Sequence, residues 1–252
     1  MKASPYKFFG LLLLISLPFW VVGSIVRVEV LPGVPLSAAM VVVPLLTAVI
    51  LIGRHKSLSV LSTFLMSALD ASRIKLWVWP FAIGLMPMVM LVSAIIQSAL
   101  GESLPAFTFD AGDVLLLFSL FFLAATLEEL GWTGYATRPM VQRYGILGAG
   151  IAIGIVSAVW HLVPLLQVER AWDWVACWAL GTVSRRVLIV WMFVRGGQSV
   201  FSASLLHAMS NVSWMLFPVM GSHFDPMVSG LILLAITMAV QMITWRRSSL
   251  SA

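Results

Sequence analysis

The sequence contains few charged residues and almost no cysteine. Asp, Glu, Lys and Arg make up only 10% of its 252 residues, against about 25% in a typical soluble domain. The one cysteine, Cys177, has no second thiol with which to form an intramolecular disulfide or a cysteine-rich metal site. The low hydrophobicity that disordered chains require is also missing, because 61% of the residues are hydrophobic. These properties exclude a water-soluble domain, a disordered chain and a fold held together by disulfides.

The chain consists instead of long apolar runs, and its mean hydropathy is +1.03. A membrane-spanning helix needs about 20 consecutive, mostly apolar residues. The runs predict about eight transmembrane helices, at residues 8–26, 36–53, 76–100, 112–137, 146–165, 172–194, 199–217 and 227–245. Unbroken runs of this length differ from the weak alternating segments of a β-barrel. We therefore expect an all-α, polytopic membrane helical bundle that forms a single integral-membrane domain over residues 1–252.

The segment at 54–75 differs from these runs. It carries charges at both ends and apolar residues at helical spacing. This pattern is typical of an amphipathic helix that lies in the membrane interface, so we expect an interfacial helix here.

The few charges are sorted by sign along the predicted topology. With the N-terminus in the cytoplasm, eleven of the fifteen Lys and Arg residues fall in cytoplasmic segments, and seven of the ten acidic residues fall on the other side. Membrane proteins keep an excess of positive residues in their cytoplasmic loops. The sequence therefore predicts that both termini are cytoplasmic. The compact chain, with short loops, favours a multi-pass protein of the prokaryotic cell membrane.

A small group of polar side chains lies inside the predicted spans, where ionisable groups are energetically costly. These residues are Glu128, Glu129, His161, Arg185, Arg186, His207 and Asn211. At about 1.5 Å of rise per residue, the glutamates, the histidines and the asparagine fall near the middle of the bilayer on three different spans. His207 and Asn211 also share one helix face, because they are four residues apart. We therefore expect these side chains to meet inside the bundle.

This group suits the hydrolysis of a peptide bond. A carboxylate removed from water accepts a proton from a water molecule more readily near neutral pH. Histidines can move protons, and an asparagine amide can donate to the oxyanion formed during acyl transfer. Glu128, His161 and His207 also match a zinc site of two histidines and one glutamate, so zinc or another divalent metal and a metal-free reaction both stay open. Chains of carboxylates and histidines also relay protons, which keeps a proton-coupled transporter as an alternative.

Three short motifs carry a family resemblance, and all of them lie within residues 112–217. They are Glu-Glu-Leu-Gly-Trp-Thr-Gly-Tyr at 128–135, Trp-His-Leu-Val-Pro at 160–164, and His-Ala-Met-Ser-Asn at 207–211, with an Arg-Gly-Gly-Gln-Ser turn at 195–199 before the last. In their order and spacing they resemble the motifs of the CPBP family of intramembrane endopeptidases. That family includes CAAX prenyl proteases and Abi-type, bacteriocin-processing enzymes.

The resemblance implies an eight-helix membrane protease and assigns roles by motif position. Glu128 would activate the hydrolytic water, His161 and His207 would assist, Asn211 would stabilise the oxyanion, and Glu129 would support them. Both metal-dependent and metal-free mechanisms are described for the family; a metal would be held by Glu128, His161 and His207. The implied partners are membrane lipid and a peptide or protein substrate, including lipidated ones, and no nucleic acid.

Two positions depart from the family pattern. Thr133 stands where the first motif has an arginine, and Ser157 stands where the second motif usually has phenylalanine. The missing arginine would support the second glutamate, and Arg186 or Arg138 would have to supply that charge instead. The departure keeps a non-catalytic membrane adaptor or a bacteriocin self-immunity protein as alternatives to a protease.

Overall fold

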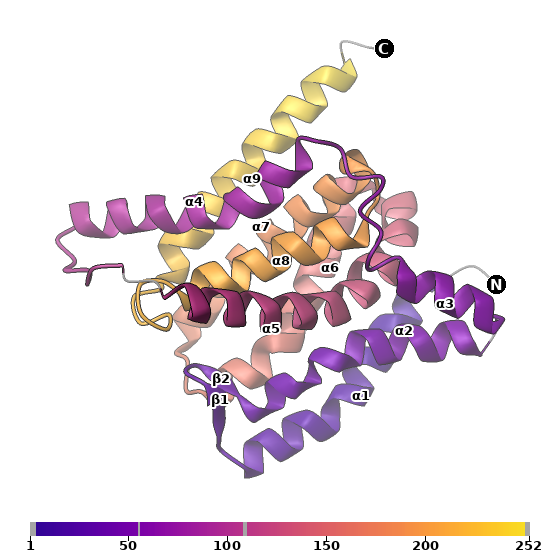
Figure 1. Cartoon of the computed structure of the whole chain (residues 1–252), viewed down its shortest axis with the longest axis horizontal. Helices are drawn as coiled ribbons and strands as arrows, with labels where there is room; N and C mark the ends of the chain where they lie inside the picture. The colour runs from indigo at the N-terminus through magenta and orange to yellow at the C-terminus, as the bar shows by residue number, and fades with distance from the viewer. Residues whose placement is uncertain (1–3, 55, 108–109, 250–252) are drawn as a thin grey trace.

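The computed structural model describes residues 4–54, 56–107 and 110–249, and nearly all regular structure in these ranges is helical (Figure 1). The elements, in chain order, are α1 (Pro5–Ile25), β1 (Glu29–Leu31), β2 (Val34–Pro35), η1 (Leu36–Val42), α2 (Val43–Gly53), α3 (Leu58–Met66), α4 (Val78–Ala99), α5 (Ala111–Glu129), η2 (Leu130–Thr137), α6 (Arg138–Gln167), α7 (Trp172–Gly196), α8 (Val200–Met215) and α9 (Pro226–Ser249). The all-α bundle predicted from the apolar runs is confirmed.

Each predicted span coincides with helical structure, but the helices divide the chain differently. Within the described ranges, six continuous helical stretches are long and apolar enough to cross a membrane. One of them, Ala111–Gln167, covers two predicted spans, because η2 joins α5 to α6 without a loop. A break inside α6 at Gly145, whose φ is +69°, separates those two spans. Helix α8, with 16 residues, is shorter than a full crossing.

The segment predicted to be an interfacial helix contains the shorter helix α3. None of its residues is buried, and Leu58 and Met66 are 84% and 61% exposed. The chain after α3 is fixed to the turn between α7 and α8: the Ser199 hydroxyl donates to the Asp70 carbonyl at 2.7 Å, and the Lys75 amide donates to the Gly196 carbonyl at 3.0 Å. An exposed apolar helix attached in this way agrees with a position at the membrane surface, which stays a prediction.

Helix α5 changes into the π-helix η2 directly after the two glutamates. π-Helical segments are rare and occur frequently at functional sites. Gly131, in the first turn of η2, lies against α2: a Cβ atom there would be only 2.6 Å from the carbonyl oxygen of Pro44. Glycine at this position therefore lets η2 approach the backbone of α2.

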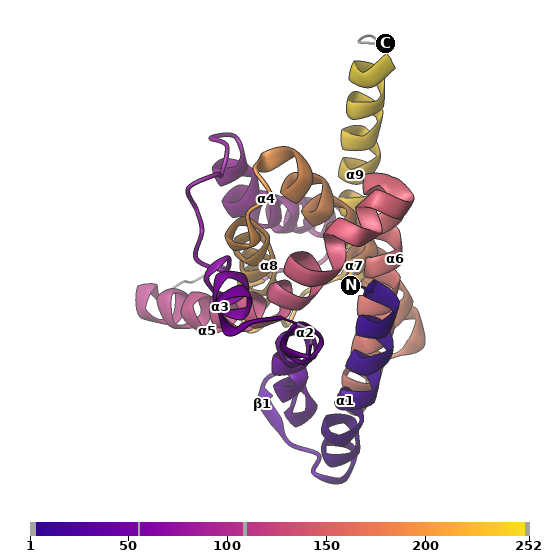
Figure 2. The same ribbon diagram turned by 90° about the vertical axis from the view of Figure 1, so that its right-hand side faces the viewer.

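Helices α6 and α7 pack closely through small residues. A Cβ atom on Gly150 would lie 2.6 Å from the Cα atom of Val187, and one on Gly154 would lie 2.9 Å from the Cα atom of Val183. Two glycines four residues apart on one face are a common helix–helix contact in membranes. This contact holds α7 beside the part of α6 that carries His161, and Figure 2 shows the two helices together, with α9 extending beyond the bundle.

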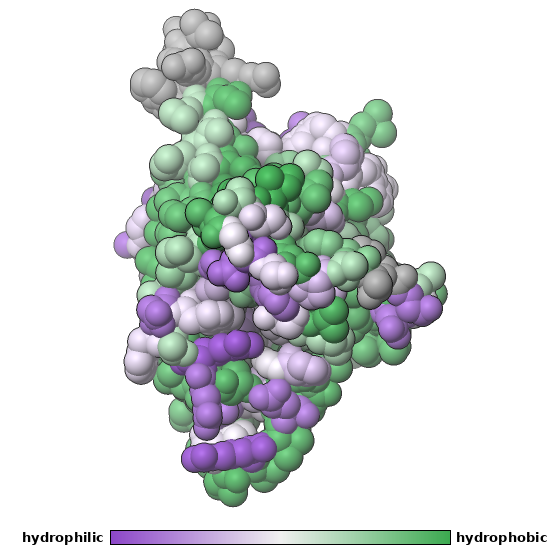
Figure 3. Space-filling model, turned by 90° about the vertical axis from the view of Figure 1, so that its left-hand side faces the viewer, coloured by the Kyte–Doolittle hydropathy of each residue, from purple (hydrophilic) through white to green (hydrophobic). Residues whose placement is uncertain are grey.

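The outer surface of the bundle is largely apolar. Exposed leucine, isoleucine and methionine side chains lie along several helices, among them Leu14, Ile95, Leu123 and Met238. Figure 3 shows wide hydrophobic areas on one face, with hydrophilic residues gathered over its middle and lower part. Extensive exposed apolar surface marks contact with a partner or a membrane. Together with the long apolar helices, this surface supports a multi-pass membrane protein.

Candidate active site

The two adjacent glutamates end α5 and point in different directions. Glu128 is 7% exposed and Glu129 is completely buried. Successive residues on a helix are rotated by about 100°, so the two carboxylates cannot face the same space. Glu129 meets side chains from η2, α7 and α8, whereas Glu128 lines the cavities of the bundle.

The Glu129 carboxylate is fully occupied by neighbouring donors. Arg186 Nη1 lies 2.8 Å from both of its oxygens, and this arginine is itself buried. His207 Nδ1 lies 2.9 Å from Oε1, and the Thr133 hydroxyl donates to Oε2 at 2.5 Å. A buried charge is tolerated when it is paired and its remaining lone pairs accept hydrogen bonds. Glu129 therefore connects α5, η2, α7 and α8 and has no lone pair directed at a substrate.

Arg186, and not Arg138, supplies the positive charge at Glu129. Arg138 is exposed at the start of α6, and within the described ranges the arginine that pairs with Glu129 is Arg186. The expectation that either arginine could support the second glutamate is thus resolved by position. The Arg186 guanidinium also lies 5.9 Å from the ring centroid of the buried Trp132.

The Glu128 carboxylate has a different environment. Within the described ranges it accepts one hydrogen bond, a long one of 3.3 Å from the indole Nε1 of Trp132. It lines two cavities together with His161 and Asn211. Glu128 therefore combines burial with access to a space that a water molecule and a substrate can enter.

Both histidines have their Nδ1 atoms engaged by acceptor groups. His161 Nδ1 lies 2.8 Å from the carbonyl oxygen of Ser157, and a carbonyl only accepts, so Nδ1 carries the proton. His207 Nδ1 faces the Glu129 carboxylate in the same way. In the neutral imidazole the opposite nitrogen then has a free lone pair. The His161 ring is held by Trp160 and Trp178, whose ring centroids lie 4.7 Å and 5.4 Å away.

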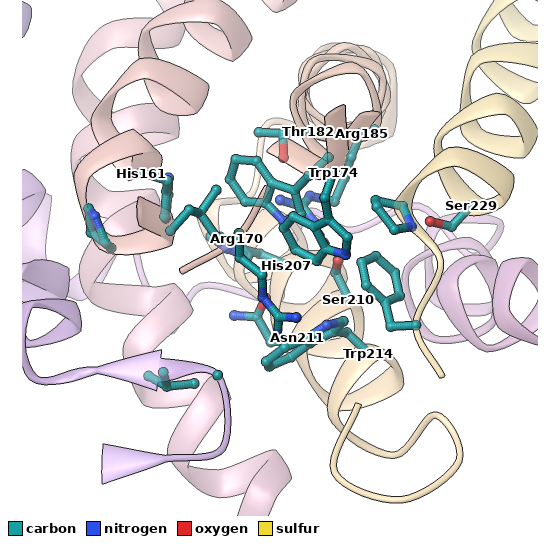
Figure 4. A pocket seen from close by; sticks show the side chains of 18 of the residues that line it. His161, Arg170, Trp174, Thr182, Arg185, His207, Ser210, Asn211, Trp214 and Ser229 are labelled. Atoms are coloured by element: carbon teal, nitrogen blue, oxygen red, sulfur yellow. Dashed lines mark hydrogen bonds between the residues drawn. The ribbon is translucent and has the colours of Figure 1, made fainter. Parts of the chain in front are cut away.

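Two cavities meet at these residues. The first has a volume of about 190 Å³ and extends between α7, α8 and α9, and His207 and Asn211 line it (Figure 4). The second has a volume of about 400 Å³ and extends between η1, α5 and α6. Glu128, His161 and Asn211 line both cavities, and so does Val34 of the β1–β2 hairpin. The structure therefore brings together the four side chains that were expected to meet from their depth along the spans: Glu128, His161, His207 and Asn211.

The same part of the chain matches a known protein family. Residues 110–213 match the family model described as type II CAAX prenyl endopeptidase, Rce1-like. The chain is 29% identical over 190 residues to CAAX prenyl protease 2 of Methanococcus maripaludis, covering 70% of each protein. The chain is thus similar to Rce1-like CAAX prenyl endopeptidases over this domain. It is a membrane protease, that is, a peptide hydrolase, and the predicted resemblance is confirmed.

In this protein the metal ligands considered from the sequence are not gathered into one site. Within the described ranges no three His, Cys, Asp or Glu side chains lie close enough together to hold a metal ion. One nitrogen of His207 is engaged with Glu129. Glu128, His161 and His207 therefore surround a cavity without forming a ligand cluster.

The sequence did not single out two further residues that line the first cavity. Thr182 and Trp178 lie on α7, three and seven residues before Arg185, and line the cavity with it. Residues at these spacings share a helix face. The spacing from Arg185 was therefore a signal that could have identified both.

Proposed function

We propose that this protein hydrolyses a peptide bond of a membrane-associated substrate with a water molecule activated by Glu128. The observation that carries the proposal is the contrast between the two glutamates. Glu129 is occupied by Arg186, His207 and Thr133, whereas Glu128 faces both cavities and accepts a single weak hydrogen bond. Glu128 is therefore the carboxylate available as a general base.

The proposed reaction begins when Glu128 takes a proton from water as the water oxygen attacks the substrate carbonyl carbon. The new C–O bond produces a tetrahedral oxyanion, and the side-chain amide of Asn211 donates to it. The C–N bond then breaks, and the proton returns from Glu128 to the leaving amine. His161 and His207 assist from the same cavity through their Nε2 atoms, as acceptors that hold the water or the leaving amine.

Glu129 acts as a positioning residue in this proposal. Its contact with Nδ1 fixes the tautomer and ring orientation of His207, as a carboxylate does in other histidine-containing sites. Arg186 in turn holds the carboxylate. Although Thr133 replaces the motif arginine, Glu129 still has a cation beside it, so the replacement gives no reason for inactivity.

We propose a prenylated peptide as the substrate class, because the relative is named a CAAX prenyl protease. The second cavity supports this choice, since apolar side chains such as Met40, Val41 and Phe121 line much of it. An apolar space beside Glu128 suits a lipid-bearing segment that approaches from the bilayer. The prokaryotic cell membrane is the proposed location.

The test uses purified protein in liposomes and a fluorogenic prenylated peptide with a C-terminal CAAX sequence. We expect Glu128→Gln to lower kcat by about 10²–10⁴-fold, the usual contribution of a general base. Glu102→Gln is the matched control, because Glu102 is an exposed acid between α4 and α5 and should leave kcat unchanged. Hydrolysis by Glu128→Gln at the rate of the unaltered protein would show that Glu128 is not the base. If the unaltered protein cleaved no such peptide but bound a partner, a non-catalytic adaptor would be favoured.

A further inference from the structure

We propose that Arg185 and Thr182 of α7 form a subsite for a carboxylate group of the peptide substrate. This inference rests on the proposed function, because the subsite lies in the cavity that contains Glu128. It adds a specificity determinant that neither the motif residues nor the reaction itself requires. Figure 4 shows Thr182 and Arg185 on the same stretch of α7, above His207 and Asn211 in the view.

Arg185 is a charged residue inside a membrane-crossing helix without an acidic partner. Within the described ranges it forms no ion pair, whereas the adjacent Arg186 is paired with Glu129. Its hydrogen bond is to a neutral group, the hydroxyl of Ser210, at 2.6 Å. A guanidinium has five N–H donors, so most of its donor capacity remains for the cavity that it lines. Charges at this depth usually pair or face a functional space.

Thr182 provides an independent observation at the same place. It is 3% exposed, and within the described ranges its hydroxyl has no hydrogen-bond partner, although it lines the cavity. The buried Thr237, by contrast, donates to the carbonyl oxygen four residues earlier at 2.8 Å. Thr47 is a second buried threonine whose hydroxyl has no partner in these ranges, but it lines neither of the two cavities. An unpartnered buried hydroxyl is costly unless a ligand satisfies it. Thr182 is three residues before Arg185, so both donors share a helix face.

The cavity connects this face of α7 with the reacting group. Trp178, on the same face, packs against the His161 ring at 5.4 Å between centroids. Arg170, which also lines the cavity, lies 4.7 Å from the ring centroid of Trp174 and adds a second cation. Glu128 is the one acidic residue among the lining residues. Two arginines against one glutamate give the cavity a field that favours an anionic ligand.

A carboxylate fits these donors best. Guanidinium N–H groups match two carboxylate oxygens in a plane, and a hydroxyl adds a third donor. A peptide offers a carboxylate either at its C-terminus or on an acidic side chain. Both sources have the same chemistry, and substrates that differ in a single group can separate them.

The experiment measures binding in the inactive Glu128→Gln background, so that cleavage does not interfere. Two prenylated CAAX peptides are compared, identical except that one ends in a free acid and the other in an amide. We expect the acid to bind at least about tenfold more tightly, the usual size of a hydrogen-bonded charge interaction. Adding Arg185→Gln should remove the preference, Arg185→Lys should keep part of it, and Thr182→Val should reduce it about threefold.

The subsite would be overturned if the Glu128→Gln protein bound the acid and the amide equally. It would also be overturned if adding Arg185→Gln left the preference for the acid unchanged. If Arg185→Gln does not fold, Arg185→Lys and Thr182→Val still test the subsite. A preference for the acid that neither variant changes also overturns the proposal. An amidated peptide with Asp as its last residue identifies the source: binding as tight as the acid assigns the subsite to a side-chain carboxylate. Vesicles with and without phosphatidylglycerol test lipid phosphate, and a preference that disappears with this lipid would contradict a substrate subsite.

The same measurements separate this inference from the proposed function. If Glu128→Gln cleaved as fast as the unaltered protein, Glu128 would not be the base. The ratio of the KM values for the acid and the amide peptides would still show whether Arg185 binds the carboxylate. If Glu128→Gln were inactive and bound both peptides equally, the reaction would stand and the subsite would be wrong.

Discussion

The second glutamate of the pair shows how a single buried charge is arranged in this protein. Glu129 accepts hydrogen bonds from Thr133 on η2 and from Arg186 on α7, and His207 on α8 completes the set. The motif arginine of the family would stand at position 133, one turn from Glu129 on the same helical stretch. Here a hydroxyl occupies that position, and the charge comes from another helix. The electrostatic requirement is met by a different residue, so Thr133 and Arg186 must be considered together.

This arrangement predicts that charges at positions 133 and 186 are interdependent. Arg186→Met leaves the buried Glu129 carboxylate without its arginine, which should lower the free energy of unfolding by about 3–5 kcal/mol. Thr133→Arg places a second cation beside Arg186, so it should also reduce stability and kcat. The double variant Thr133→Arg/Arg186→Met has one cation again and should recover a large part of both. Thermal unfolding in detergent and peptide hydrolysis measure the two effects.

The control for this cycle is Thr133→Val, which removes one hydrogen bond and adds no charge. It should cost about 1 kcal/mol. If the double variant were as impaired as the sum of the two single ones, the two positions would act independently and the account of Glu129 would fail.

The placement of the histidines predicts the response to metal removal. His161, His207 and Glu128 are not part of a three-donor cluster in the described ranges, and His207 Nδ1 is engaged with Glu129. We therefore expect dialysis against EDTA to leave kcat unchanged, and elemental analysis of active protein to find less than one zinc per chain. Loss of activity with EDTA and recovery with zinc would contradict this expectation.

At the scale of the elements, glycines determine how closely the helices carrying the site approach one another. Gly150 of α6 leaves no room for a side chain against Val187 of α7. His161 follows on α6, and Arg185 and Arg186 lie on α7, so this contact fixes the distance between a histidine and the arginines. A change at Gly150 should therefore affect the site without touching it.

We predict that Gly150→Ala lowers both the unfolding temperature and kcat, because its Cβ atom would lie 2.6 Å from the Cα atom of Val187. Gly84→Ala in α4 is the matched control, since a Cβ atom there meets nothing within 4 Å. Alanine in an open helical position should leave the protein as stable or stabilise it by about 1 kcal/mol. Equal effects of the two changes would mean that the contact between α6 and α7 does not limit packing.

The sequence predicts depth in this fold better than it predicts orientation. Rise per residue is constant along a helix, so counting residues predicted one level for Glu128, His161 and Asn211, and the structure has all three lining the same two cavities. Which side chains meet also depends on rotation about each helix axis. The π-helix at η2 changes that rotation directly after the glutamates, and the sequence did not show it. The choice of Arg186 over Arg138, and the unpartnered hydroxyl of Thr182, likewise depend on packing between helices.

At the scale of the whole molecule, the turns gather at two opposite ends of the bundle. Figure 1 shows the β1–β2 hairpin, the end of α4 and the start of α5 on the left, and α3 on the right. The hairpin therefore belongs to the end predicted to lie outside, and α3 to the end predicted to be cytoplasmic. Acidic residues such as Glu29 and Glu102 lie near the first end, and Arg54 and Arg195 lie near the second. This distribution agrees with the charge sorting of the sequence.

The orientation can be tested with single cysteines, because Cys177 is the one native thiol. Starting from Cys177→Ser, cysteine is placed at one of three exposed serines, Ser57, Ser103 or Ser222. A membrane-impermeant maleimide applied to intact cells should label the variants at 103 and 222, which the topology places outside. It should label the variant at 57 only after lysis, since Arg54 and Lys56 keep that end in the cytoplasm. Labelling at 57 in intact cells, with 103 protected, would reverse the orientation and place the hairpin end of the active-site cavities on the cytoplasmic side.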